Sequence, residues 1–174
     1  MLETVAALDV PLVLMHTRGD AASMAARAIY ADVRAEVCDE LRGRVGAAAR
    51  AGIPPWHVVV DPGLGFAKTP EHSLDLLGAG LERFVAELVP SARASDGRAG
   101  FACATVVGAS RKGFIGRVLD EPDPLRRGWG NAAAVSAAVV ARADVVRVHD
   151  VAEMKQVALM ADAIHRRAPA AVSE

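Results

Sequence analysis

Four short runs of apolar residues, many of them β-branched, recur along the chain with longer segments between them. They lie at residues 11–15, 57–60, 104–107 and 145–148. Continuous apolar runs of this length are typical of parallel strands that are covered on both faces. We therefore predict four parallel strands, each buried from both sides.

The segments that follow these runs carry apolar residues at spacings of three and four, the period of an amphipathic helix. They predict helices over residues 30–51, 71–89, 131–143 and 151–166. Before the second of these helices, Thr69 and Pro70 supply a cap residue and a first-turn proline. Strand and helix thus alternate four times, which indicates an α/β fold with a parallel sheet and right-handed crossovers.

Two architectures contain four strand–helix units in succession. One is a small open doubly wound sheet, and the other is half of an eight-stranded barrel. A whole barrel takes about 250 residues, and this chain has 174. We see no domain boundary, so residues 1–174 are expected to form one unit. Residues 90–100 are the least patterned stretch and are expected to form an exposed, mobile loop.

Composition narrows the function classes. The net charge of −1 gives no basic footprint for nucleic acid, and 4% aromatic residues are too few for a base-stacking platform. The longest apolar run, residues 132–141, falls short of the roughly 20 residues that a membrane span needs. No signal peptide is recognisable. Cys38 and Cys103 are expected to be reduced core residues of a cytoplasmic protein.

Each apolar run ends in polar or glycine residues. In parallel α/β folds, ligands bind where the carboxyl ends of the strands converge. The four polar clusters are therefore expected to form one concave site. They lie at residues 15–19, 61–68, 108–112 and 147–150.

Asp61 directly follows a predicted buried strand, where a carboxylate is costly unless donors surround it. A ligand with adjacent ring and amino N–H groups, such as the edge of a pterin, would satisfy it through two hydrogen bonds. A helix cap, or a pairing with Lys68 or Lys112, is the structural alternative. Gly63 and Gly65 follow, and glycine lets a backbone approach a ligand closely.

Ser110, Arg111 and Lys112 come after the third run, where a helix is expected to start. A helix N-terminus with a hydroxyl and two cations is suited to an anion, and a solvated basic turn is the alternative. Lys112 could also donate to a ring carbonyl or nitrogen. Phe66 could form an apolar wall of the pocket or pack within its own loop.

Arg147 and His149 are two residues apart, so on one strand they would face the same side. An arginine within an apolar strand must find an acceptor, and a diphosphate matches the fork of its guanidinium group. His149 could donate to a phosphate oxygen or be a satisfied core residue. For His16 a structural role and a ligand contact are equally open, while Met15 is expected to pack under a flat ring or within the barrel.

These residues lie within four strings, LMHTRGD, VVVDPGLGFAKTPEHSLDLL, VVGASRKGFIGRVL and VVRVHDV. Together they resemble the dihydropteroate synthase family, in the same order and at the same spacing, from about Val10 to the last helix. The resemblance implies four parallel βα units forming the C-terminal half of a TIM (β/α)8 barrel, strands five to eight, as a single partial pterin-binding domain. It also implies a transferase of folate biosynthesis that condenses 6-hydroxymethyl-7,8-dihydropterin diphosphate with 4-aminobenzoate to give dihydropteroate.

The resemblance also implies a role for each matching residue, and no covalent nucleophile is expected. The pterin-binding positions fall on Asp61, Lys112, Met15 and Gly108, the diphosphate-binding positions on Arg147 and His149, and the aminobenzoate-side positions on Ser110 and Phe66.

The first four strand–helix units of the family are absent from the chain. Magnesium is expected from the family, but its usual ligand, a strand-one asparagine, is among the missing parts, so no metal ligand is expected here. We therefore expect poor catalysis by the chain alone. Its exposed strand edges favour a homodimer or complementation by the missing N-terminal half. The alternatives are a catalytically silent pterin-binding half-barrel, a methyltetrahydrofolate-binding methyltransferase domain, and an unrelated doubly wound domain.

Overall fold

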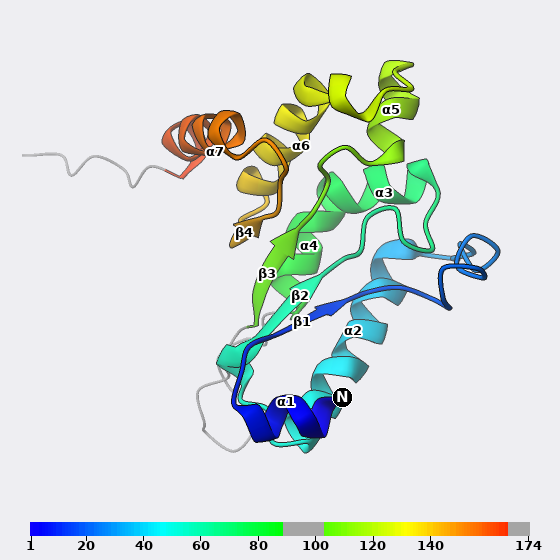
Figure 1. Ribbon diagram of the computed structural model, residues 1–174, viewed down its shortest axis with the longest axis vertical. Coiled ribbons are helices and arrows are strands. Elements are labelled where there is room, and N and C mark those ends of the chain that lie inside the picture. The colour runs from blue at the N-terminus through cyan, green and yellow to red at the C-terminus, as the bar shows by residue number, and fades with distance from the viewer. Residues whose placement is uncertain (89–102, 167–174) are drawn as a thin grey trace, which may run out of the picture.

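The computed structural model describes residues 1–88 and 103–166, and its strands form one parallel sheet (Figure 1). The strands are β1 (Leu12–Met15), β2 (Val58–Asp61), β3 (Ala104–Val107) and β4 (Val145–Val146). They lie side by side in chain order, β1-β2-β3-β4. A doubly wound sheet reverses its strand order at a switch point, whereas the strands of a barrel follow one another around it. The observed order is that of a barrel segment.

One helix precedes β1, and at least one helix follows each strand. The helices are α1 (Leu2–Leu8), α2 (Val33–Arg50), α3 (Pro70–Leu77), α4 (Ala79–Leu88), α5 (Gly113–Leu119), α6 (Gly128–Val140) and α7 (Val151–His165), with two 3-10 turns at Pro55–His57 and Pro124–Arg126. The helices predicted over residues 30–51, 131–143 and 151–166 are confirmed to within three residues at each end. The short helix α1 was not predicted.

The helix predicted over residues 71–89 was wrong as one element, because Gly78 divides it into α3 and α4. The Gly78 N–H donates to the Leu74 carbonyl at 2.9 Å, and its ψ of −134° ends the helix. The start of α3 was predicted correctly, since the Thr69 hydroxyl accepts from the His72 N–H at 3.2 Å. The loop expected at residues 90–100 lies outside the described residues.

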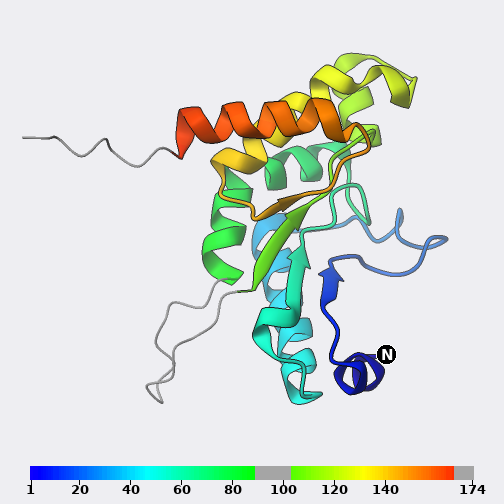
Figure 2. The same ribbon diagram turned by 60° about the vertical axis from the view of Figure 1, so that its left-hand side comes forward.

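The core lies between the sheet and the helices on one side of it. Figures 1 and 2 show α2 and α4 on the same side of the strands. Leu14 and Val60 point to that side and are buried, whereas Val13 is 57% exposed and Val145 is 47% exposed. Successive side chains of a strand point to opposite faces. The prediction that both faces are covered was therefore wrong for the described residues, which supply helices to one face only.

The core itself combines apolar side chains from α2, α3 and α4 with those of β2. Its deeply buried large members include Leu41, Leu76, Leu81, Phe84 and Val60. Cys38 and Cys103 are also buried, as expected of core cysteines. Among the helices of the described ranges, none is both long enough and apolar enough to span a membrane.

Candidate functional site

Asp61 is the last residue of β2 and is only 6% exposed. One of its oxygens, Oδ1, accepts from the Gly63 N–H at 2.7 Å. Burial raises the pKa of Asp61, while the Gly63 hydrogen bond and the charges of Lys112, Arg147 and Lys68 lower it. Asp61 is thus a buried carboxylate near three cations, one from its own loop, one that follows β3 and one that follows β4.

Lys112 reaches back from the turn after β3 to the loop after β2. Its Nζ donates to the Leu64 carbonyl and lies 4.8 Å from the centre of the Phe66 ring. Burial lowers the pKa of Lys112 to about 8, against the attraction of Asp61. The amine and the ring therefore lie together beside the carboxylate.

Arg147 lies beyond β4, which ends at Val146, so the prediction that it sits within a strand was wrong. Its N–H still donates to the Val107 carbonyl at 2.9 Å. Its side chain is exposed and lies over Gly108, since a Cβ built on Gly108 would be 3.4 Å from Nε and Nη2. Gly108 thus leaves room for the guanidinium group at the end of β3.

His149 also lies past the end of β4 and faces the end of β3. Its ring Nδ1 is 2.9 Å from the Ser110 Oγ, and its backbone N–H donates to the same oxygen at 3.3 Å. Both Arg147 and His149 therefore face residues that follow β3, which preserves the predicted common side although the predicted strand is shorter.

The predicted helix start with two cations needs a correction. Helix α5 begins at Gly113 and has seven residues, with Lys112 as its N-cap. Arg111 turns away and pairs with Asp150 at 2.7 Å. Its backbone adopts a φ of +61°. Ser110 and Lys112 remain directed toward their partners at the strand ends, so this turn presents one cation rather than two.

Arg127 fixes this turn from outside. Its guanidinium group donates to the carbonyls of Arg111 at 2.9 Å, Lys112 at 3.3 Å, Glu121 at 3.0 Å and Pro122 at 2.7 Å. One side chain thus ties the β3–α5 turn to the segment between α5 and α6. Sequence reasoning did not single it out, because its partners are backbone atoms.

Replacing Arg127 by methionine is expected to lower the free energy of unfolding by about 2–3 kcal/mol, because four carbonyls lose a charged donor. Arg126→Met is the matched control, since that side chain is 74% exposed and pairs only with Glu121 among the described residues. It should leave stability almost unchanged. Urea denaturation of both variants measures the difference, and equal losses would contradict this role of Arg127.

Met15 and His16 end the first strand in different environments. Met15 pairs with Asp61 in the register of the sheet, and its Cγ would lie 3.4 Å from a Cβ built on Gly63. His16 is completely buried. Its Nε2 is 3.1 Å from Glu40 Oε2. Of the two roles left open for His16, the structure supports the structural one, and it places Met15 beside the Asp61 loop.

Lys68 is the residue whose position the sequence did not indicate. It is 8% exposed, and its Nζ lies 2.8 Å from His16 Nδ1 and 3.1 Å from the Phe66 carbonyl oxygen. A direct ion pair with Asp61 was one alternative from the sequence, but in the part of the chain that is described the Lys68 ammonium group contacts His16 and the Phe66 carbonyl instead. A lysine that interrupts a loop of glycines and apolar residues was the available signal.

The groups at these strand ends do not fit a magnesium ion. Over residues 1–88 and 103–166, no three His, Cys, Asp or Glu side chains come together as metal ligands would. Around Asp61 the charged neighbours are cations, which repel a metal ion. The described residues therefore supply no site for the magnesium that the resemblance implies.

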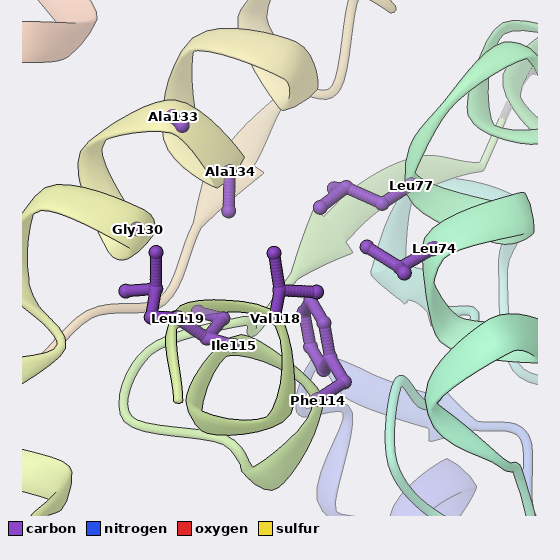
Figure 3. A pocket seen from close by; sticks show the side chains of 9 residues that line it. All are labelled: Leu74, Leu77, Phe114, Ile115, Val118, Leu119, Gly130, Ala133 and Ala134. Carbon is purple, nitrogen blue, oxygen red and sulfur yellow. The ribbon is translucent and has the colours of Figure 1, made fainter. Parts of the chain in front are cut away.

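A separate cavity of about 250 Å³ lies in the helical layer between α3, α5 and α6 (Figure 3). Its lining residues are Leu74, Leu77, Phe114, Ile115, Val118, Leu119, Gly130, Ala133 and Ala134. None of these side chains can ionise or form a hydrogen bond, so the cavity has no group for catalysis or for recognition of a polar ligand. The chemistry of the described residues is concentrated at the strand ends instead.

Comparison with known proteins agrees with this geometry. Residues 1–149 match the family described as "Pterin binding enzyme". The chain is 40% identical over 156 residues to the dihydropteroate synthase of Synechocystis sp., a match that covers 90% of this chain and 49% of that protein. The chain thus spans about half the length of this relative.

The fold is similar to that of a solved dihydropteroate synthase. The Thermus thermophilus enzyme in complex with 4-aminobenzoate superimposes with a TM-score of 0.80 at 35% identity, covering 94% of this chain and 60% of that one. The same enzyme in complex with 6HMPPP gives a TM-score of 0.80 at 35% identity, covering 94% of this chain and 59% of that one.

Proposed function

The chain belongs to the family of pterin binding enzymes, and we propose that its strand ends form the pterin-diphosphate part of a dihydropteroate synthase site. The proposed reaction condenses 6-hydroxymethyl-7,8-dihydropterin diphosphate with 4-aminobenzoate to give dihydropteroate and diphosphate. The observation that carries the proposal is the gathering of Lys112 and Arg147, both far from Asp61 in the sequence, around the Asp61 carboxylate. The solved relatives with 4-aminobenzoate and with 6HMPPP support it.

Asp61 would recognise the pterin ring. Its Oδ1 already accepts from the Gly63 N–H, which fixes the plane of the carboxylate. The remaining lone pairs can accept from the ring N–H and the adjacent amino group of the pterin, a pair of donors that matches two carboxylate oxygens. Lys112 would donate to a ring carbonyl or nitrogen, and Met15 and Gly108 would line the pocket.

Arg147 and His149 would hold the diphosphate. The exposed guanidinium group over Gly108 can place two parallel N–H groups on phosphate oxygens. His149, oriented by Ser110 through its Nδ1, has Nε2 left to donate. These two groups would face the anion while Asp61 faces the ring, so the two ends of one substrate would meet opposite charges.

The proposed reaction depends on stabilising the negative charge of the departing diphosphate. The bond between the pterin methylene carbon and the diphosphate oxygen breaks, and its electron pair leaves with the diphosphate, which the cations stabilise. The nitrogen of 4-aminobenzoate forms the new bond to that carbon and loses a proton. Ser110 and Phe66 would lie on the aminobenzoate side and hold the amine in position. No covalent intermediate with the protein is required.

The uncovered face of the sheet motivates our proposal for partners. Val13 and Val145 are about half exposed on the two edge strands, and such edges pair readily with other strands. We propose that further strand–helix units, from a second copy or from an N-terminal half, complete the barrel and the aminobenzoate side of the site. We also propose a cytoplasmic location, which the absence of a cysteine framework supports.

Lys112→Ala and Arg147→Ala are each expected to weaken binding of the pterin diphosphate by about 1–3 kcal/mol, the usual cost of losing a charged hydrogen bond. Isothermal titration calorimetry on the full chain measures this. Lys155→Ala is the matched control, because Lys155 is exposed on α7. Unchanged affinity in both Lys112→Ala and Arg147→Ala would contradict the proposed site.

A catalytically silent pterin-binding half-barrel is the second candidate, favoured by the uncovered sheet face. Adding 4-aminobenzoate after the pterin diphosphate separates the two, because only the enzyme releases diphosphate. A methyltetrahydrofolate-binding domain is disfavoured, since that ligand carries no diphosphate for Arg147 and His149.

A further inference from the structure

The turn between β3 and α5 holds a backbone conformation that most residues avoid. The Lys112 N–H donates to the Ala109 carbonyl at 3.2 Å, which closes a four-residue turn. Its third residue, Arg111, has a φ of +61°, a value that glycine adopts most readily. A residue with a side chain stays in this region only where its surroundings hold it. The Arg111 side chain is held by Asp150 at 2.7 Å, and its backbone is held from another direction.

Arg127 holds this backbone from the segment before α6. Its Nη1 donates to the Arg111 carbonyl at 2.9 Å and to the Lys112 carbonyl at 3.3 Å. Its Nε and Nη2 donate to the carbonyls of Glu121 and Pro122 beyond the end of α5, at 3.0 Å and 2.7 Å. Because the donors of a guanidinium group form a fork of fixed geometry, the contacts with Glu121 and Pro122 determine where the fork meets the turn.

Gly116 leaves the space in which this guanidinium group lies. A Cβ built on Gly116, in the middle of α5, would be 2.5 Å from the Nε, Cζ and Nη2 of Arg127. A free arginine side chain could move away at little cost, but this one is tied to four carbonyl groups. Glycine weakens the interior of a helix relative to alanine. The space for Arg127 therefore explains a glycine here better than the needs of α5 do.

The turn that Arg127 holds carries the lysine of the proposed pterin site. The Nζ of Lys112 donates to the Leu64 carbonyl and lies over the Phe66 ring, 4.8 Å from its centre. A long side chain keeps such contacts only if the backbone from which it extends is itself fixed. Displacement of the turn would withdraw the Lys112 ammonium group from both partners.

We propose that Arg127 is a positioning residue of the pterin site: in the space left by Gly116, it holds the carbonyls of Arg111 and Lys112 and so directs the Lys112 side chain into the pocket. Each of its three guanidinium nitrogens donates to a protein carbonyl, so Arg127 acts through Lys112 rather than on the substrate. The inference rests on the proposed function in one respect, that Lys112 donates to the pterin ring.

The first test follows the ε-methylene protons of Lys112 by NMR, with the signal assigned by its loss in Lys112→Ala. Protons over the face of an aromatic ring are shifted upfield, so this signal should lie upfield of that of Lys155, which is exposed on α7. Gly116→Ala, which keeps the arginine, and Arg127→Met, which removes it, should each move the signal toward the Lys155 value. Gly43→Ala is the matched control, because this glycine of α2 has nothing within 4 Å of an added Cβ.

A residue that only stabilises the turn would change the free energy of unfolding without moving the Lys112 signal of the folded chain. Gly116→Ala keeps every donor of Arg127 and tests the inference even if Arg127→Met does not fold. Both substitutions break the same contacts, so their effects should not add. In the Arg127→Met chain, Gly116→Ala should leave the signal where it is. A Lys112 signal that stays in place in the folded single variants would overturn the inference.

Binding of 6-hydroxymethylpterin, a probe without phosphate, distinguishes the inference from the proposed function. Gly116→Ala and Arg127→Met should each weaken its binding by about 10-fold, the order expected when a charged hydrogen bond is lost. If Lys112→Ala weakens binding but these two variants do not, Arg127 has no positioning role and the proposed function stands. If the wild-type chain does not bind the probe although the Lys112 signal moves as expected, the proposed function fails, while Arg127 still determines the place of Lys112.

Discussion

Replacing Gly63 by alanine is expected to lower the free energy of unfolding by about 4 kcal/mol or more, a large share of the roughly 5–15 kcal/mol that a domain of this kind has. A Cβ built on Gly63 would lie 1.9 Å from the His16 carbonyl oxygen and 3.0 Å from its carbon. The His16 N–H donates to the Asp61 carbonyl at 2.9 Å, so the backbone of His16 cannot simply retreat. The φ of +68° adds a smaller cost for any residue with a side chain.

Two other glycines provide matched controls. Gly65 has a φ of +76°, but its added Cβ would meet only the Lys112 Cδ, at 3.6 Å, so Gly65→Ala should cost about 1–2 kcal/mol from backbone strain alone. Gly113, the first residue of α5, has nothing within 4 Å of an added Cβ, and alanine there should be tolerated. Urea denaturation compares the three, and a Gly63→Ala variant as stable as Gly65→Ala would show that the close approach of the two chain segments is unimportant.

Asp61→Asn is expected to weaken binding of the pterin ring by about 100-fold, which corresponds to roughly 3 kcal/mol. Asparagine keeps one oxygen for the Gly63 N–H but turns an N–H₂ group, another donor, toward the donors of the pterin. The fold should survive, because burial raises the pKa of Asp61. A raised pKa means that the folded state disfavours the ionised carboxylate at neutral pH, so a neutral amide relieves a cost of folding.

The variant should therefore be at least as stable as the wild-type chain at pH 7 while binding far less 6-hydroxymethylpterin. The stability advantage should disappear as the pH falls through the pKa of Asp61, where the wild-type carboxyl is already neutral. Asp75→Asn is the matched control, since the Asp75 side chain is 57% exposed and pairs with Arg34. Affinity retained within about threefold in Asp61→Asn would contradict the assignment of Asp61.

Local sequence patterns predicted most of the framework because the signals are local. The apolar runs located all four strands, and the convergence of parallel strand ends brought Asp61, Lys112 and Arg147 together as expected. The length of β4 was not predictable in this way. Its run of four residues, three of them apolar, includes two that pair with β3 in the strand ladder, and the position of the last ladder pair depends on tertiary contacts.

Contacts between distant residues account for the remaining differences. The Arg111–Asp150 pair joins residues 39 apart, and the Lys68–His16 contact joins residues 52 apart. No period or spacing in the sequence specifies such partners. The break between α3 and α4 could have been recognised from Gly78, because glycine disfavours a helix interior. The helical spacing of apolar residues continues across Gly78, however, and it favoured one continuous helix. The uncovered face of the sheet could not be predicted, because the apolar sequence of a strand does not specify which element packs against each of its faces.

The most direct test of the central claim is a map of amide chemical shifts in the ¹⁵N-labelled chain during titration with 6-hydroxymethyl-7,8-dihydropterin diphosphate. A pterin-diphosphate site at the strand ends predicts saturable shifts concentrated in residues 61–66, 108–112 and 147–150, three segments from the ends of β2, β3 and β4. Shifts confined to the apolar cavity between α3, α5 and α6, or no shifts in these three segments at millimolar ligand, would contradict the claim.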